Sequence, residues 1–146
     1  KFDVPTEIIA ALASRESHIG TALGRHGNKP GWGDNNQGWG ILQVDRQKGT
    51  RAIRGLNSPD SQEHIEQAME IFTASRDAVR LKHPDWTDEN ILKGACVAYN
   101  AGASSVRTIE KMNEGTTHHD YGDDVIARAQ FYLTALDHSP AQKVAE

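Results

Sequence analysis

The chain has 146 residues, a formal net charge of −4 and a pI near 6.0, and 37% of its residues are hydrophobic. This length suits one domain with a sizeable core, and the acidic balance excludes the usual reasons to expect nucleic acid or an anionic membrane surface as a partner. No run approaches the roughly 18 apolar residues of a membrane span, so we expect no membrane insertion.

The first predicted element is a helix over about residues 5–20. Its apolar residues Ile9, Leu12 and Ile19 recur at helical spacing, and Glu16 falls on the same stripe. Because burial disfavours the charged form of a carboxyl group and raises its pKa, Glu16 is a candidate general acid. The open alternative is that an arginine neutralises Glu16, which then serves only packing. The candidate partners are Arg15, Arg107 and Arg128.

The next region is rich in glycine. Residues 24–49 hold seven of the thirteen glycines, interleaved with Asn, Asp and aromatic residues, which excludes a helix. The segment WGILQVD predicts a short strand, so we expect a small antiparallel sheet or an extended loop. Asp34 and Asp45 lie here beside Trp32 and Trp39, whose faces can stack on sugar rings. Taken singly, both aspartates are also typical turn residues.

The remaining chain predicts further helices. Ser58-Pro59-Asp60 indicates the start of a long amphipathic helix that stops near His83. Thr87 is the predicted cap of the next helix, which ends at Gly102. A short helix is expected over 105–111 and a last one from about Tyr121. The apolar stripes of the three longer helices are Ile65, Met69, Phe72 and Val79; Ile91, Ala95 and Tyr99; and Val125, Ala129, Tyr132 and Leu136.

The predicted architecture is therefore mainly α, of the α+β class, with a small antiparallel sheet in one glycine-rich lobe. We predict a single domain over residues 1–138 and a frayed tail over 139–146. The chain begins with Lys1 rather than Met and shows no signal-peptide pattern, which leaves the compartment open.

Cysteine and histidine usage gives no reason to expect a metal or cofactor. Cys96 is the only cysteine and lies in the apolar run KGACVAY, which is typical of a buried, inert thiol. His118, His119 and Asp120 have the right side chains for a metal site. Adjacent residues rarely converge on one ion, however, and no His-x-x-x-His pair supports such a site.

The three acids fit one kind of chemistry. Hydrolysis of a glycosidic bond needs one protonated acid and a second carboxylate that orients water, and Glu16, Asp34 and Asp45 are residues of these types. Four blocks of the sequence are SRESHIG, GWGDNNQGWGILQVD, AYNAGASSVR and GTTHHDYGDDVIARAQFY. In this order, over roughly residues 4–134, they resemble the motif blocks of the goose-type lysozymes. The resemblance implies a lysozyme-like fold, hydrolysis of the β-1,4 bond between N-acetylmuramic acid and N-acetylglucosamine in peptidoglycan, and a role in antibacterial defence.

The resemblance also implies roles for single residues. Glu16 takes the place of the general acid, and Asp34 and Asp45 take the places of the acids that position and activate water. Four further residues would bind substrate in or near the cleft: Gln43, Tyr99, Asn100 and Tyr121. Compared with the family, five extra residues around GRHGNKP predict a longer loop at the cleft rim.

The implied ligands are bacterial peptidoglycan and N-acetylglucosamine oligomers, and a bacterial lysozyme-inhibitor protein is a further candidate partner. Such a substrate favours an extracellular location, and we expect a monomer. We expect an inverting reaction, for which the acid and the base lie about 6.5–9.5 Å apart. Two alternatives stay open: a lytic transglycosylase, which cleaves the same bond without water, and a peptidoglycan-binding module without turnover.

Overall fold

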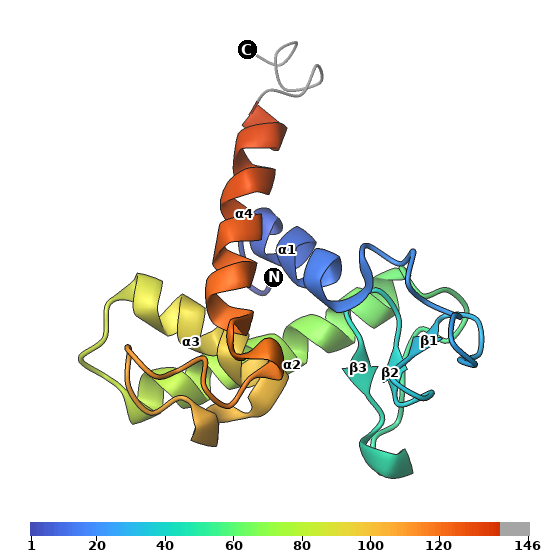
Figure 1. The fold of residues 1–146 in the computed structure, drawn as a ribbon, viewed down its shortest axis with the longest axis horizontal. Coiled ribbons are helices and arrows are strands. Elements are labelled where there is room, and N and C mark those ends of the chain that lie inside the picture. Colours follow the sequence, from blue (N-terminus) through green and yellow to red (C-terminus); the bar gives the residue numbers. More distant parts are fainter. Residues whose placement is uncertain (138–146) are drawn as a thin grey trace.

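The computed structural model describes residues 1–137, and the predicted frayed tail over 139–146 lies outside this part of the chain. The described residues form a helical part and a lobe with a small sheet, which lie side by side in Figure 1. The predicted mainly α, α+β class is confirmed. The helices are α1 (Thr6–Ser17), α2 (Gln62–Lys82), α3 (Asp88–Ala101) and α4 (Tyr121–Asp137), and the strands are β1 (Trp32–Gly33), β2 (Gly38–Trp39) and β3 (Val44–Asp45).

Capping residues set the ends of the helices in the middle of the chain. The Thr87 side chain accepts the N–H of Asn90 at 3.2 Å, so α3 begins where it was predicted. It ends before Gly102, whose φ of +86° suits glycine. Helix α2 ends at Lys82, close to the predicted stop, but it begins at Gln62 because Ser61 rather than Ser58 is its cap.

Helix α1 is shorter than predicted. It ends at Ser17 because His18 and Ile19 both adopt positive φ, and the N–H of Ile19 bonds back to the carbonyl of Ala13 at 3.0 Å. Ile19 therefore leaves the helix and is 51% exposed, so its assignment to the buried stripe was wrong. Glu16 lies on the last turn.

The prediction of a short helix over 105–111 was also wrong. Only a 3-10 turn, η2 (Ala103–Ser105), forms there. Val106 and Met112 are both fully buried, but they are six residues apart, which is not a helical spacing. The Thr108 side chain accepts the N–H of Lys111 at 3.1 Å, a local bond that competes with helix formation.

The lobe contains the predicted small antiparallel sheet, with strand order β1-β2-β3. Trp32 pairs with Trp39, and Gly38 pairs with Asp45. The turn between β1 and β2 includes Asp34, Asn35 and Asn36, all with φ between +51° and +61°. Aspartate and asparagine tolerate this left-handed conformation better than other side chains, which explains why the turn needs no glycine at these three positions.

The core joins the lobe to the helices. Helix α2 packs against α3, α1 packs against α4, and α3 also contacts α4. Leu42 and Val44 from the lobe are buried in the same cluster as Leu12, Phe72 and Val125. None of the described helices is both long and apolar enough to cross a membrane.

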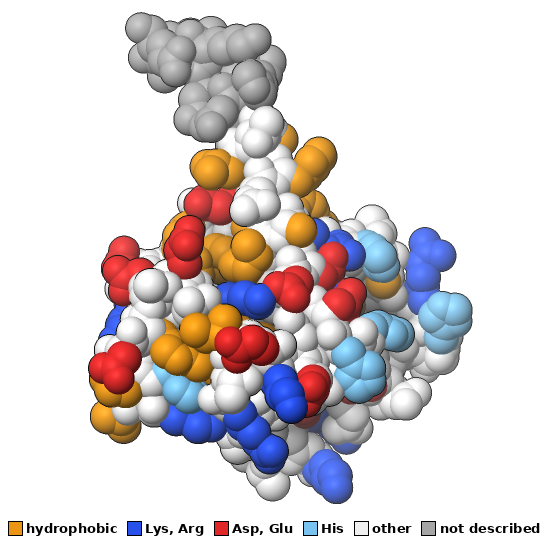
Figure 2. Space-filling view, turned by 60° about the vertical axis from the view of Figure 1, so that its left-hand side comes forward, with side chains coloured by type: hydrophobic (Ala, Val, Ile, Leu, Met, Phe, Trp, Pro, Cys, Tyr) orange, Lys and Arg blue, Asp and Glu red, His pale blue; other side chains and the backbone are white. Residues whose placement is uncertain are grey.

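On α4, Val125 and Ala129 are buried and Tyr132 packs against the core, as predicted, whereas the side chain of Leu136 lies outside those that the structure describes. Phe131 and Leu133, farther along α4, are exposed. Figure 2 shows hydrophobic side chains on the part of this helix that leads to the grey residues, and acidic and basic side chains intermixed on the face below.

Candidate active site

A cleft of about 500 Å³ lies between the helical part and the lobe. Six of the seven predicted site residues line it: Glu16, Asp34, Gln43, Asp45, Tyr99 and Asn100. They come from the end of α1, from the sheet and its loops, and from the end of α3. The packing of the helices on the lobe therefore brings together residues that lie up to 84 positions apart, from Glu16 to Asn100.

Glu16 combines burial with a single side-chain hydrogen bond. The Tyr121 hydroxyl donates to its Oε1 at 2.5 Å. Burial raises the pKa of Glu16 to about 7, an effect that the Tyr121 hydrogen bond and the Arg15 charge oppose and the Asp34 charge reinforces. Because Oε1 is occupied by the tyrosine, the proton of the neutral acid belongs on Oε2. Glu16 is thus arranged to hold and release one proton near neutral pH.

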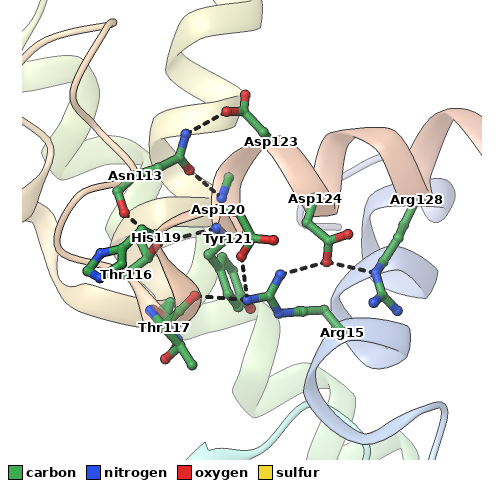
Figure 3. A network of polar contacts seen from close by, with 12 residues as sticks. Arg15, Asn113, Thr116, Thr117, His119, Asp120, Tyr121, Asp123, Asp124 and Arg128 are labelled. Carbon is green, nitrogen blue, oxygen red and sulfur yellow. Dashed lines mark hydrogen bonds and ion pairs between the residues drawn. The ribbon is translucent and has the colours of Figure 1, made fainter.

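The neighbouring arginines do not pair with Glu16. Figure 3 shows the Arg15 guanidinium between Asp124, at 2.6 Å, and Asp120, at 3.0 Å. Arg128 lies on the other side of Asp124, at 2.8 Å from the same carboxyl group. Both guanidinium groups are therefore engaged by α4 and the residue before it, which leaves Glu16 without an ion pair in the described part of the chain.

Asp34 and Asp45 are both exposed on the lobe side of the cleft. The Asp34 carboxylate has no hydrogen-bond partner among the described residues, and its charge reaches Glu16. The Asp45 carboxylate accepts the N–H of Gln47 at 2.7 Å through Oδ1. Asp45 is therefore partly a turn residue, with Oδ2 left for other partners, whereas Asp34 is free on both oxygens.

Gln43 braces the sheet under the cleft. Its Nε2 donates to the carbonyl oxygens of Gly38 at 3.1 Å and Gly40 at 3.0 Å, and its φ is +50°. A Cβ atom at Gly38 would lie 2.3 Å from the Gln43 Oε1, and one at Gly33 would lie 2.7 Å from it. The two glycines therefore leave the space in which the Gln43 side chain lies.

The three predicted site residues on α3 and α4 each hydrogen-bond to another part of the site. The Tyr99 hydroxyl donates to the carbonyl of Leu42 at 2.5 Å, and burial raises its pKa. The Asn100 side-chain oxygen accepts the N–H of Thr117 at 3.1 Å, which holds the loop before α4 at the cleft. Tyr121 is 1% exposed and lies behind Glu16 rather than in the wall of the cleft. Its place in the site comes through the Glu16 carboxyl group.

The tryptophans do not form the sugar-stacking surface that the sequence suggested. Trp39 is only 4% exposed, donates from its indole N–H to the carbonyl of Gly55 at 3.2 Å and packs closely on Gly31. Trp32 contacts it with tilted rings 5.2 Å apart. Neither residue lines the cleft, so the pair stabilises the lobe.

Sequence reasoning did not name several residues in the cleft wall: His26, Asn28, Arg51 and Thr117. His26 and Asn28 belong to the segment GRHGNKP, which was predicted to form a rim loop, and the structure places this loop at the cleft. Thr117 belongs to the GTTHHDYG block. The polar side chains of these two segments were the signal that could have found His26, Asn28 and Thr117, whereas Arg51 lies in neither segment.

The described residues contain a larger cavity, of about 1000 Å³, between the N-terminal segment, α2 and α3. It has none of the three candidate acids in its wall, so size alone is a poor guide to the chemistry here. Among residues 1–137, no three His, Cys, Asp or Glu side chains are grouped in a way that could hold a metal ion.

Comparison with known proteins supports the resemblance in the sequence. The family model for lysozyme g matches residues 1–135. The chain is 45% identical over 132 residues to a lysozyme g of Casuarius casuarius and 45% identical over 132 residues to one of Struthio camelus, with 90% of the chain covered in each case. It is 42% identical over 125 residues, or 86% of the chain, to a lysozyme g of Gallus gallus.

The aligned regions make up 66%, 60% and 55% of these three relatives, so the chain spans somewhat less than two thirds of their length. Residues 1–135, which the family model matches, include nearly all of the described fold, from the N-terminal segment into α4. With a family model that covers nearly all of it and relatives at this level of identity, the chain belongs to the lysozyme g family.

Proposed function

We propose that this chain is a peptidoglycan hydrolase that cleaves the β-1,4 bond between N-acetylmuramic acid and N-acetylglucosamine and serves antibacterial defence. The observation that carries the proposal is the asymmetry of the cleft: a half-buried Glu16 with its pKa raised to about 7 lies on one side, and exposed Asp34 and Asp45 lie on the other. Glycoside hydrolysis uses such a pair of unlike carboxyl groups.

In the proposed reaction, Glu16 gives its Oε2 proton to the glycosidic oxygen as the bond to C1 breaks. The Tyr121 hydroxyl stabilises the carboxylate that results, through the hydrogen bond to Oε1. Asp34 accepts a proton from a water molecule on the opposite face of the sugar, and Asp45 helps to orient that water. The hydroxide equivalent adds to C1, so the product forms with inverted configuration.

The name of the relatives, lysozyme g, supports the same reaction class. A water route also fits the two aspartates, because a lytic transglycosylase lets the muramic acid close on itself and needs only one glutamate. A binding module without turnover would have no use for a glutamate whose burial keeps it protonated near neutral pH, because burying such a polar group costs free energy.

Two measurements test the proposal. The protein should clear a suspension of Gram-positive cell walls, and early proton NMR spectra of a digest of a β-1,4-linked N-acetylglucosamine hexamer should show the α-anomer first. The β-anomer first would contradict inversion, a 1,6-anhydro product from peptidoglycan would mean a transglycosylase, and tight wall binding without any product would mean a binding module.

A further inference from the structure

The lobe is held to the helices at two consecutive peptide groups. Ser17 at the end of α1 donates from Oγ to the carbonyl of Ile41 at 2.8 Å. From α2, His64 accepts the N–H of Leu42 at 3.1 Å through Nε2. From α3, Tyr99 donates to the carbonyl of Leu42 at 2.5 Å. Three helices thus fix the backbone immediately before Gln43, and two of them hold the N–H and the carbonyl of the same residue, Leu42.

His64 is an unusual residue for its position. It is fully buried, and its Nδ1 has no hydrogen-bond partner among the described residues. Because Nε2 accepts a hydrogen bond, the proton of the neutral ring must be on Nδ1. Burial lowers the pKa of His64 to about 4, although the charge of Asp60 acts in the opposite direction. The buried Nδ1–H without a partner costs free energy. What an apolar residue at this position could not supply is the Nε2 acceptor for the Leu42 N–H.

The lobe backbone also lies directly on the imidazole. A Cβ atom at Gly40 would be 2.4 Å from both Cε1 and Nε2 of His64. Gly40 has φ +79°, which favours glycine in any case. The ring therefore limits how closely the Gly40 backbone can approach α2, and its Nε2 orients the Leu42 N–H. From there the chain continues to Gln43 and Asp45.

We propose that His64 is a positioning residue for the hydrolysis, whose ring holds the Leu42 N–H and thereby places Gln43 and Asp45 opposite Glu16. This inference rests on the proposed function. His64 does not line the cleft, so a substrate bound there would not touch it. Its effect on the reaction passes through one peptide group of the lobe, and misplacement of a group in the cleft by about 1 Å can cost on the order of 100-fold in rate.

The contact itself has a spectroscopic signature that does not depend on activity. Nitrogen-15 NMR of the wild-type protein at pH 6 to 8 should show His64 as a neutral ring with the proton on Nδ1, and the exposed His26 serves as the reference in the same spectrum. A charged ring at His64, or a proton on Nε2, would overturn the proposal, because neither form can accept the Leu42 N–H.

Kinetics with the N-acetylglucosamine hexamer tests the consequence. His64→Gln places Oε1 where Nε2 was and keeps an acceptor, so its kcat should stay within about threefold of the wild type. His64→Phe keeps the ring without the acceptor and should lower kcat by about 10- to 100-fold with little change in KM. The matched control is His83→Gln, because His83 bonds to Val106 and stacks on Trp86 away from the cleft.

A folded His64→Phe protein with wild-type kcat would overturn the proposal. If this variant does not fold, His64→Asn replaces it, because the asparagine oxygen stands in place of Nδ1 and cannot reach the Leu42 N–H. Equal kcat values for the Gln and Asn variants would then contradict the positioning role. An inactive wild-type protein with the Nδ1–H tautomer intact would instead count against the proposed function and leave the His64 contact established.

Discussion

The helical part and the glycine-rich lobe surround their carboxyl groups in opposite ways. Glu16 lies on the last turn of a helix that packs against α4, with the buried Tyr121 behind it. Asp34 and Asp45 lie at a turn and on a strand of two residues, and both are exposed. The helices pack around Glu16 from several directions, whereas the turn after β1 and the end of β3 leave the Asp34 and Asp45 side chains in water, although Trp39 and Val44 on the same small sheet are buried.

The difference shows how one cleft can hold a proton donor and a proton acceptor at the same pH. Burial raises the pKa of Glu16 to about 7, and no cation in the described residues pairs with it to cancel the effect. The lobe contributes charge without burial, and the Asp34 charge adds to the shift at Glu16. The helical part therefore supplies the protonated acid, and the lobe supplies the charged carboxylates.

The largest expected effect comes from replacing Glu16, which supplies the proton from the helical side of the cleft. Glu16→Gln should reduce wall clearing by at least about 1000-fold, because the amide cannot give up a proton to the leaving oxygen. Circular dichroism should show the same fold as the wild type. The control is Glu63→Gln, an exposed substitution on α2 that should leave clearing unchanged. Clearing near the wild-type rate by folded Glu16→Gln would remove Glu16 from the mechanism.

The next effect comes from the lobe. Asp34→Asn and Asp45→Asn should each retain part of the activity, and the double variant should lose much more than either, on the order of 100-fold or more, because both residues orient one water. Asp34→Asn should be the more damaging single change, since Asp45 already uses one oxygen for the Gln47 N–H. Initial rates on the hexamer measure this. Independent, mild losses that simply multiply would contradict a shared water.

A third effect is on stability, and its sign follows from the raised pKa of Glu16. Below pH 4.5 the residue is protonated in the folded and the unfolded chain, so Glu16→Gln should change little. Between pH 4.5 and about 7 the unfolded chain has lost this proton while the folded chain still holds it. Over this range the wild type progressively loses up to about 3 kcal/mol of stability that the Gln variant keeps.

Urea unfolding at pH 4 and pH 8 compares the two proteins. The free energy of unfolding of Glu16→Gln, relative to that of the wild type, should be higher at pH 8 than at pH 4. The same difference in the free energy of unfolding at both pH values would show that Glu16 is not buried as described.

The smallest effect concerns the tyrosine behind the acid. The Tyr121 hydrogen bond lowers the pKa of Glu16, so Tyr121→Phe should raise it further and move the alkaline limb of the pH–rate profile to higher pH. Loss of the donor should also reduce kcat by about 3- to 10-fold at neutral pH. A shift of the alkaline limb to lower pH would contradict this role. Tyr132→Phe, on the same helix, is the matched control.

The helical part was largely predictable because helical periodicity and caps are local. The Thr87 cap, the Gly102 stop and the start of α4 at Tyr121 lie where the sequence indicated. The errors came where local bonds override the pattern, at the left-handed residues after Ser17 and in the turn at Thr108.

In the lobe, composition predicted the kind of structure but not the role of each residue. Nothing local indicates that Trp39 is buried on Gly31, or that Gln43 braces the strands as well as lining the cleft, because both depend on contacts between segments. His64 could have been found. It is spaced by four from the buried Ala68 and Phe72, so it is a polar residue on a buried stripe, which is the signal that drew attention to Glu16.

The central claim is that the helical part keeps Glu16 protonated near neutral pH. Carbon-13 NMR titration of protein labelled at the glutamate carboxyl carbons tests it most directly, with the Glu16 signal assigned by its loss in Glu16→Gln. We predict a midpoint for Glu16 at about pH 7. A midpoint near 4.5, the ordinary value for glutamate, would contradict the account, because Glu16 would then be a carboxylate at neutral pH with no proton to give.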